Sequence, residues 1–172
     1  MRNFQRYGRW WENFIKLGIN VDISSDYRDL FKTLNRHKVK YLVIGAYAVT
    51  FYTEPRYTKD LDIWVSNDKA NAKRLHKALA DFGAPLKGVS AEDFANKKMI
   101  YQIGVAPVRI DILLDVSGMK FENAWKNRKR TNYGGISINI LGVKELIYSK
   151  KKTKREQDIL DINKLTNKKF LR

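Results

Sequence analysis

The sequence contains no cysteine, and its two histidines, His37 and His76, stand alone in segments with helical character. The absence of cysteine excludes disulfide bonds, a zinc site built from thiolates and a cysteine nucleophile. No stretch approaches the ~18 consecutive apolar residues of a membrane span. The apolar segment at residues 10–15 is too short and too polar for the core of a signal peptide. We therefore expect a cytoplasmic protein with no membrane partner.

Acidic residues are also scarce, because 18 Asp and Glu face 34 Lys and Arg and give a net charge of +16. The excess is unevenly distributed: residues 41–120 are close to neutral, whereas residues 121–172 contain 14 basic and five acidic residues. A dense basic surface attracts polyanions through the release of counterions. The C-terminal third therefore predicts contact with nucleic acid, RNA in particular, and a merely solvated basic surface is the alternative interpretation.

The apolar periodicity predicts one compact α+β domain over residues 23–172, with a mixed β-sheet and helices mainly on one face. A basic and aromatic extension at residues 1–22 precedes it, and we expect this extension to pack on the domain or on a partner subunit. Its aromatic side chains offer a second possibility, stacking on nucleic-acid bases. The expected helices span residues 24–35, 69–82, 91–98, 121–130, 142–150 and 155–166, with another after residue 45, and the expected strands span residues 40–45, 60–65, 99–105, 108–114 and 136–140.

Two aspartates, Asp60 and Asp62, interrupt an apolar run that ends in Leu61-Asp62-Ile63-Trp64-Val65. On a strand, side chains alternate between faces, so the two carboxylates point the same way and the aliphatic residues point the other. Two like charges aimed at one spot repel each other unless a cation joins them. The spacing therefore indicates half of a Mg²⁺ site, with capping of a loop or ion pairing as the alternative.

A third carboxylate, Asp111, lies in another short apolar run and shares its expected face with Arg109 and Leu113. If the two strands are neighbours, the three acids form a site for two divalent ions roughly 3.5–4 Å apart. Oxygen ligands suit Mg²⁺, which takes few of them from protein and the rest from phosphate and water. We expect two Mg²⁺ ions, with Mn²⁺ as a substitute.

Gly45 and Ala46 follow directly after an expected strand and open an expected helix. Free N–H groups at the start of a helix bind phosphate, and a small residue lets the phosphate approach the backbone. This junction therefore predicts a phosphate-binding turn near the carboxylates.

These elements together resemble the pattern of the nucleotidyltransferase superfamily, which has a polymerase-beta-like fold. That pattern consists of glycine plus a small residue (here Gly45-Ala46), an Asp-x-Asp pair (Asp60 and Asp62) and a later single acid (Asp111), in this order. The run from Arg56 to Asp62 resembles a small bacterial stand-alone branch that includes minimal nucleotidyltransferases and AbiEii-like toxins. The resemblance covers about residues 24–165, and Ala46 departs from it because glycine or serine is more usual there.

The resemblance implies an enzyme that transfers a nucleoside monophosphate from a nucleoside triphosphate to an acceptor and releases pyrophosphate. RNA or tRNA is the favoured acceptor, a protein hydroxyl is another, and a toxin–antitoxin role implies an antitoxin partner. Arg56 and Lys59 are candidates for contact with the triphosphate, or else for structural ion pairs. Arg109 is a further candidate for phosphate binding, or it simply holds Asp111 in place. A lysine of the 150–152 run, for which we select Lys151, is expected to reach the nucleotide unless the run is a solvated face.

Two other functions compete with this prediction. The first is a non-catalytic module that binds nucleic acid or a protein partner on a nucleotidyltransferase fold. The second is a metal-dependent nuclease, because clustered carboxylates also support hydrolysis. Release of pyrophosphate from a triphosphate distinguishes transfer from cleavage, and resemblance of fold does not by itself establish function.

Overall fold

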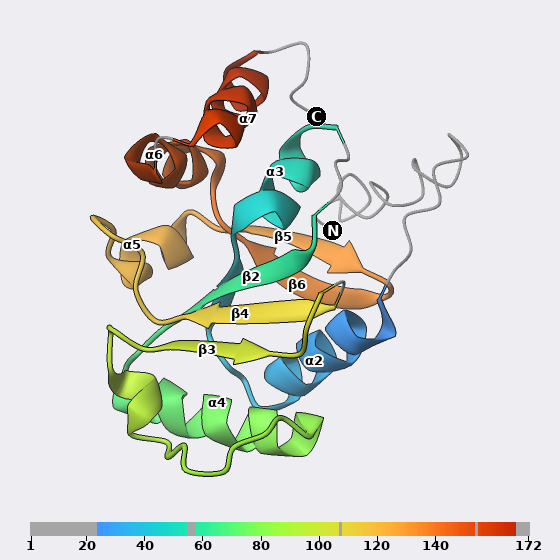
Figure 1. Ribbon diagram of the computed structural model, residues 1–172, viewed down its shortest axis with the longest axis vertical. Coiled ribbons are helices and arrows are strands. Elements are labelled where there is room, and N and C mark those ends of the chain that lie inside the picture. The colour runs from blue at the N-terminus through green and yellow to red at the C-terminus, as the bar shows by residue number, and fades with distance from the viewer. Residues whose placement is uncertain (1–23, 55–57, 107, 154, 168–172) are drawn as a thin grey trace, which may run out of the picture.

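The structure is a computed structural model that describes residues 24–54, 58–106, 108–153 and 155–167. The extension expected at residues 1–22 lies outside the described residues. Figure 1 shows a central β-sheet with helices packed around it, α4 (Lys69–Phe82) at one end of the view and α6 (Val143–Thr153) with α7 (Glu156–Thr166) at the other.

The sheet is mixed and has the strand order β3-β4-β2-β1-β6-β5. Its central strands are β1 (Tyr41–Val43) and β2 (Asp60–Val65), which pair antiparallel. On one side, β4 (Arg109–Leu113) pairs parallel with β2 and antiparallel with the edge strand β3 (Ile100–Ile103). On the other side, β6 (Ile136–Ile140) pairs parallel with β1 and antiparallel with β5 (Lys129–Tyr133). This is the mixed α+β fold that the sequence predicts.

Alternation along the strands separates an apolar face from a face that carries charge. Leu61, Ile63 and Ile112 are almost completely buried, whereas Asp60 and Asp111 are only partly buried. The apolar face is covered by α2 (Ser25–Arg36) and α4, which pack against each other, and by the 3₁₀ turn η2 (Asp93–Ala95). Burial of this face fixes the register, because a slip of one residue would turn the aspartates into the core.

The two helices on the apolar face begin and end as their sequences predict. The Ser24 side chain accepts a hydrogen bond from the Tyr27 N–H at the start of α2, and Asp68 caps α4 through the Asn71 N–H at 2.9 Å. Gly83 ends α4 in the left-handed region, which glycine adopts without a steric cost.

The expected helix at residues 121–130 is wrong in its second half. The helix α5 (Phe121–Lys126) stops early, and Lys129–Tyr133 forms the edge strand β5. The turn between β5 and β6 consists of Gly134 and Gly135, both with positive φ, as a tight hairpin requires. Two charged residues at the exposed start of β5 hide the strand pattern, and pairing with β6 overrides the weak local preference. The helix expected at residues 91–98 likewise shortens to the turn η2.

None of the helices in the described ranges has the length and apolar character needed to cross a membrane.

Candidate active site

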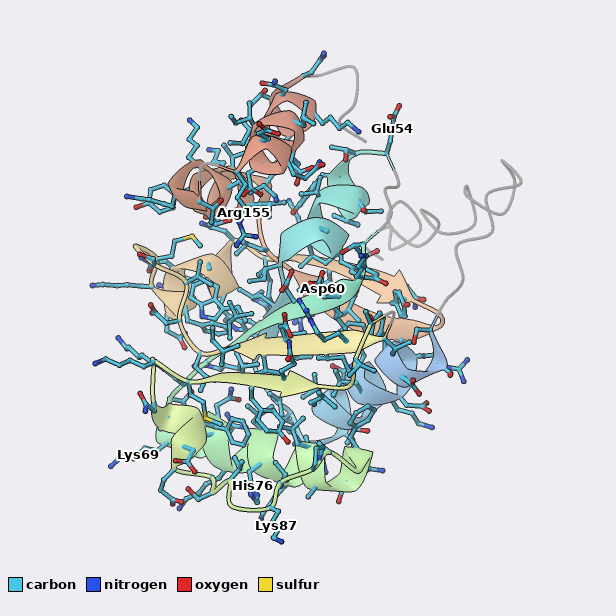
Figure 2. All side chains as sticks on the ribbon, in the orientation of Figure 1. Glu54, Asp60, Lys69, His76, Lys87 and Arg155 are labelled. Atoms are coloured by element: carbon cyan, nitrogen blue, oxygen red, sulfur yellow. The ribbon has the colours of Figure 1, made fainter. Side chains whose placement is uncertain are left out.

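The three predicted aspartates come together on two neighbouring strands. Parallel pairing of β2 and β4 places Asp60 beside Arg109 and Asp62 beside Asp111, so these four residues form a square on the charged face of the sheet. We call Asp60, Asp62, Asp111 and Arg109 the sheet cluster. Figure 2 shows Asp60 near the middle of the sheet, whereas His76 lies at the far end on α4.

Arg109 bridges two of the three acids. Its Nη2 atom donates to Asp60 Oδ2 at 2.5 Å and to Asp111 Oδ2 at 3.0 Å. The other oxygens of these carboxylates also accept hydrogen bonds, Asp60 Oδ1 from Thr58 Oγ1 at 3.1 Å and Asp111 Oδ1 from Gln102 Nε2 at 2.8 Å. All four oxygens of Asp60 and Asp111 are therefore engaged.

Asp62 is in a different position, because no described residue donates a hydrogen bond to its carboxylate. Burial, together with the nearby charges of Asp60 and Asp111, raises the pKa of Asp62 to about 6, against the opposing effect of Arg109 and Lys150. The nearby positive charges therefore do not fully offset the cost of ionising the Asp62 carboxylate.

Gly45 brings the start of the helix α3 (Gly45–Tyr52) against this carboxylate. Its φ is +62°, and a Cβ atom at this position would collide with Asp62 Oδ2. The Ile44 N–H donates to the Asp62 backbone carbonyl at 3.0 Å and so ties the turn to β2. Only glycine combines this conformation with this approach, so Gly45 explains how the turn at the start of α3 and the Asp-x-Asp strand meet.

A pocket of about 620 Å³ opens over the sheet cluster. Its floor includes Thr58, Gly45 and Ala46 in addition to the sheet cluster. The opposite wall comes from the loop after β4 and from α6 and α7, and Figure 2 shows Arg155 on that side. The charged residues of this wall are Asp115, Lys150, Lys152, Arg155 and Asp158.

Lys150 anchors that wall through a second group of charges. Its Nζ atom lies 2.8 Å from Asp158 Oδ1 and 2.7 Å from Asp161 Oδ2, and all three residues are buried. Thr153 Oγ1 also donates to Asp158, at 2.5 Å. Burial alone would raise the pKa of Asp158, but the hydrogen bonds from Lys150 and Thr153 hold it below its usual value. We call Lys150, Thr153, Asp158 and Asp161 the helix cluster.

The remaining predicted site residues lie elsewhere. Lys59 and Lys151 are exposed and are not among the described residues that line the pocket, whereas Lys152, next to Lys151, does line it. Arg56 lies outside the described residues. Trp64 shares the aspartate face but is 1% exposed and packs edge-on against Phe121 of α5, so it belongs to the core.

Sequence reasoning did not single out Lys150 and Asp158 as a pair. A signal for Lys150 exists, because it lies four residues after the buried Leu146 and so shares its helix face. The partnership with Asp158 depends on how α7 folds back on α6, which no local pattern reports.

Residues 23–170 match a family described as nucleotidyl transferase of unknown function (DUF2204). The chain belongs to this nucleotidyltransferase family. The match confirms the predicted superfamily and the predicted class of enzyme. No curated protein is significantly similar to this nucleotidyltransferase in sequence.

Two solved structures share the fold. A candidate nucleotidyltransferase from Thermotoga maritima (TM1012) has a TM-score of 0.53 and 13% identity, over 89% of this chain and 92% of that chain. Lincomycin-bound LnuA, a lincosamide antibiotic adenylyltransferase, has a TM-score of 0.54 and 16% identity, over 84% of this chain and 98% of that chain. At this level of identity the similarity shows the fold alone.

Nucleotidyltransferases of this fold generally use divalent metal ions. The sheet cluster contains the type of side chain that binds such an ion. Three carboxylates on one face supply hard oxygen donors, and the under-compensated Asp62 favours a cation beside it. The side chains are not yet in the arrangement of a metal site, since the described residues hold no group of three acidic, histidine or cysteine side chains placed to bind a metal.

Proposed function

We propose that this nucleotidyltransferase transfers a nucleoside monophosphate from a nucleoside triphosphate to an acceptor hydroxyl, with Mg²⁺ as cofactor and Mn²⁺ as a substitute. The observation that carries the proposal is the meeting of Asp60, Asp62 and Asp111 on one face, at the mouth of the turn that Gly45 opens. A core would not gather three acids in this way, because each buried carboxylate raises the free energy of the fold.

The reaction is an in-line displacement. The oxygen of the acceptor hydroxyl bonds to the α-phosphorus, the bond from that phosphorus to the bridging oxygen of the β-phosphate breaks, and pyrophosphate leaves. Asp60 and Asp62 would hold the cation that accompanies the triphosphate, and Asp111 would share the second cation and face the acceptor. When bound, the metal ions neutralise phosphate charge and lower the pKa of the acceptor hydroxyl. The carboxylates of this cluster take up the hydroxyl proton.

Phosphate contacts come from several sides of the pocket. Gly45 and Ala46 line the pocket at the start of α3, where the first N–H groups of a helix suit a phosphate oxygen. Arg109 supplies a guanidinium group on the floor of the pocket, and Lys152 lines its wall and is better placed than Lys151 to meet the triphosphate.

The acceptor that we favour is RNA. Four exposed basic residues are Lys126 on α5, Lys129 and Arg130 on β5, and Lys144 in the first turn of α6. They belong to the strongly basic C-terminal third, and such a surface suits the phosphate backbone of a nucleic acid. A role as the toxin of a toxin–antitoxin pair, acting in the cytoplasm and held in check by an antitoxin protein, follows from the resemblance to AbiEii-like toxins.

The test is transfer of label from each α-³²P nucleoside triphosphate, in the presence of Mg²⁺ and total cellular RNA. Wild type should label RNA and release pyrophosphate, and the double variant Asp60→Asn/Asp62→Asn should lose at least a thousandfold in rate, about 4 kcal/mol. Asp29→Asn is the matched control, because it makes the same chemical change at an exposed position on α2 and should leave the rate unchanged.

The position of the label identifies the acceptor. Label on RNA supports the proposal in full, and label on the protein itself moves the acceptor to a protein hydroxyl. No transfer with any triphosphate, accompanied by RNA binding that needs no metal, would instead support a non-catalytic binding module. Cleavage of RNA without release of pyrophosphate would point to a nuclease.

A further inference from the structure

Arg109 occupies the place in the sheet cluster that a metal ion would need. Its Nη2 atom binds one oxygen of Asp60 and one of Asp111, and Thr58 and Gln102 take the other two oxygens. A Mg²⁺ ion needs carboxylate oxygens aimed at it from about 2.0–2.1 Å. The Arg109 Nη2 atom lies between the two carboxylates, and a dication that bridged the same two oxygens would be repelled by the guanidinium charge.

The hold of Arg109 on the cluster is incomplete. One nitrogen makes both contacts, so the two-pronged geometry in which arginine binds carboxylates best is not used. The Nε atom of Arg109 is buried and has no hydrogen-bond partner among the described residues. The side chain is 36% exposed and borders the pocket, so it has room to move away from the acids.

Lys150 is a more firmly held cation than Arg109, because its side chain is more deeply buried. Its side chain is 8% exposed, and it binds the two acids of the helix cluster at 2.8 and 2.7 Å. Arg109 is less confined by the described residues, since its side chain is 36% exposed. Its partner acids are also only partly covered, since the side chains of Asp60 and Asp111 are 28% and 16% exposed.

We propose that Arg109 is an exchangeable internal cation that holds Asp60 and Asp111 in the free protein, competes with divalent metal for them, and is drawn off by the phosphates of an incoming nucleoside triphosphate. This inference rests on the proposed function, because it takes the sheet cluster as the metal site. Metal and nucleotide then bind together, and the free protein binds metal weakly. Arg109 exchanges a carboxylate pair for a phosphate, and the metal takes the oxygens that it leaves.

The test is a titration of the full chain with Mn²⁺ in the absence of nucleotide. Binding is measured as the loss of the free Mn²⁺ signal in electron paramagnetic resonance. Arg109→Gln should bind Mn²⁺ about tenfold more tightly than wild type, or more, within the usual range of coupling between neighbouring ligands. Arg109→Lys keeps the charge and should resemble wild type more closely. Arg155→Gln is the matched control, because Arg155 lines the same pocket but makes no contact with the sheet cluster that the structure records, and it should leave Mn²⁺ affinity unchanged.

A further variant tests whether the Mn²⁺ ion that Arg109→Gln binds lies in the sheet cluster. Adding Asp62→Asn to Arg109→Gln should abolish the tighter binding if the ion sits in the sheet cluster. If Arg109→Gln binds Mn²⁺ as weakly as wild type or more weakly, Arg109 is a support that orients the carboxylates, and the proposal is wrong.

A second measurement is made on wild type, and a variant serves only to assign the signal. The Nε–H resonance of Arg109, identified by its absence from the spectrum of Arg109→Lys, should shift when Mg²⁺ and an α,β-methylene triphosphate analogue are added together. An unmoved resonance at saturating ligand would overturn the exchange.

The two proposals fail separately. Nucleotidyl transfer by wild type, with no gain of Mn²⁺ affinity in Arg109→Gln, would keep the proposed function and reject the exchange. A gain of Mn²⁺ affinity without transfer would keep the internal cation and reject the chemistry assigned to the site.

Discussion

Two clusters of charged side chains face the same pocket, and they differ in how their charges are compensated. In the helix cluster, a buried lysine binds both acids, and hydrogen bonds keep the pKa of Asp158 low. In the sheet cluster, a single half-exposed arginine faces three acids, and the pKa of Asp62 is raised to about 6. Every acid of the helix cluster contacts its cation, whereas Asp62 of the sheet cluster has no contact with Arg109 that the structure records. Carboxylates with a raised pKa in a pocket are typical of functional sites.

The largest effect should come from removing the cation of the helix cluster. Lys150→Ala leaves the acids Asp158 and Asp161 buried without their cation, and we expect unfolding free energy to fall by about 3–5 kcal/mol. Urea denaturation followed by circular dichroism measures the change. Lys151→Ala, at the exposed neighbouring position, should change stability by less than about 0.5 kcal/mol. Equal effects of the two substitutions would show that the helix cluster does not stabilise the fold.

The difference between Lys150 and Lys151 also illustrates which features of the site can be predicted from the sequence. Alternation along two strands was enough to place Asp60, Asp62 and Asp111 on one face, because period two follows from the geometry of any strand. Which lysine of the 150–152 run lines the pocket depends on the phase of the helix, because each successive residue turns the side chain by about 100°. Lys150 and Lys152 are the residues that line the pocket.

Other features depend on pairings between distant segments. The bridge from Arg109 to Asp60 needs the register of β2 against β4, and these residues are 49 positions apart in the chain. The strand β5 was missed because its preference comes from pairing with β6 rather than from its own residues. Local periodicity therefore predicts which face a residue takes, and only the fold determines its partner.

A medium effect should come from adding a side chain at Gly45, where the turn meets the Asp62 carboxylate. Gly45→Ala places a Cβ atom in a left-handed conformation and against the Asp62 carboxylate, so we expect a loss of about 2–3 kcal/mol in unfolding free energy. Thermal and urea denaturation measure it.

Gly88→Ala is the matched control for Gly45→Ala, because Gly88 also has a positive φ but has open space where its Cβ would lie. That variant should lose only about 1–2 kcal/mol, the cost of the backbone conformation. In an Asp62→Ala background, Gly45→Ala should cost no more than Gly88→Ala. A cost that stays high in this background would contradict the contact between the turn and the carboxylate.

The smallest expected effect is a gain in the free energy of unfolding when Asp62, a proposed metal ligand, is replaced by asparagine. The pKa of Asp62 is raised from 3.8 to about 6 in the folded protein, so the folded state binds more protons than the unfolded state between these values. Stability therefore falls as the pH rises through this window, and the full penalty persists above about pH 6. Asp62→Asn removes the charge and should stabilise the metal-free protein by about 1–2 kcal/mol near pH 7.5, and by almost nothing near pH 4.

Urea denaturation of wild type and Asp62→Asn at both pH values, with chelator present, measures this difference. Asp29→Asn makes the same change at an exposed site on α2 and should show no difference between the two pH values beyond about 0.5 kcal/mol. If Asp62→Asn destabilises the metal-free protein at pH 7.5, the carboxylate stabilises the fold, and the raised pKa is contradicted. A gain in stability together with loss of Mn²⁺ binding would instead show that Asp62 is kept for its ligand, at a cost to the fold.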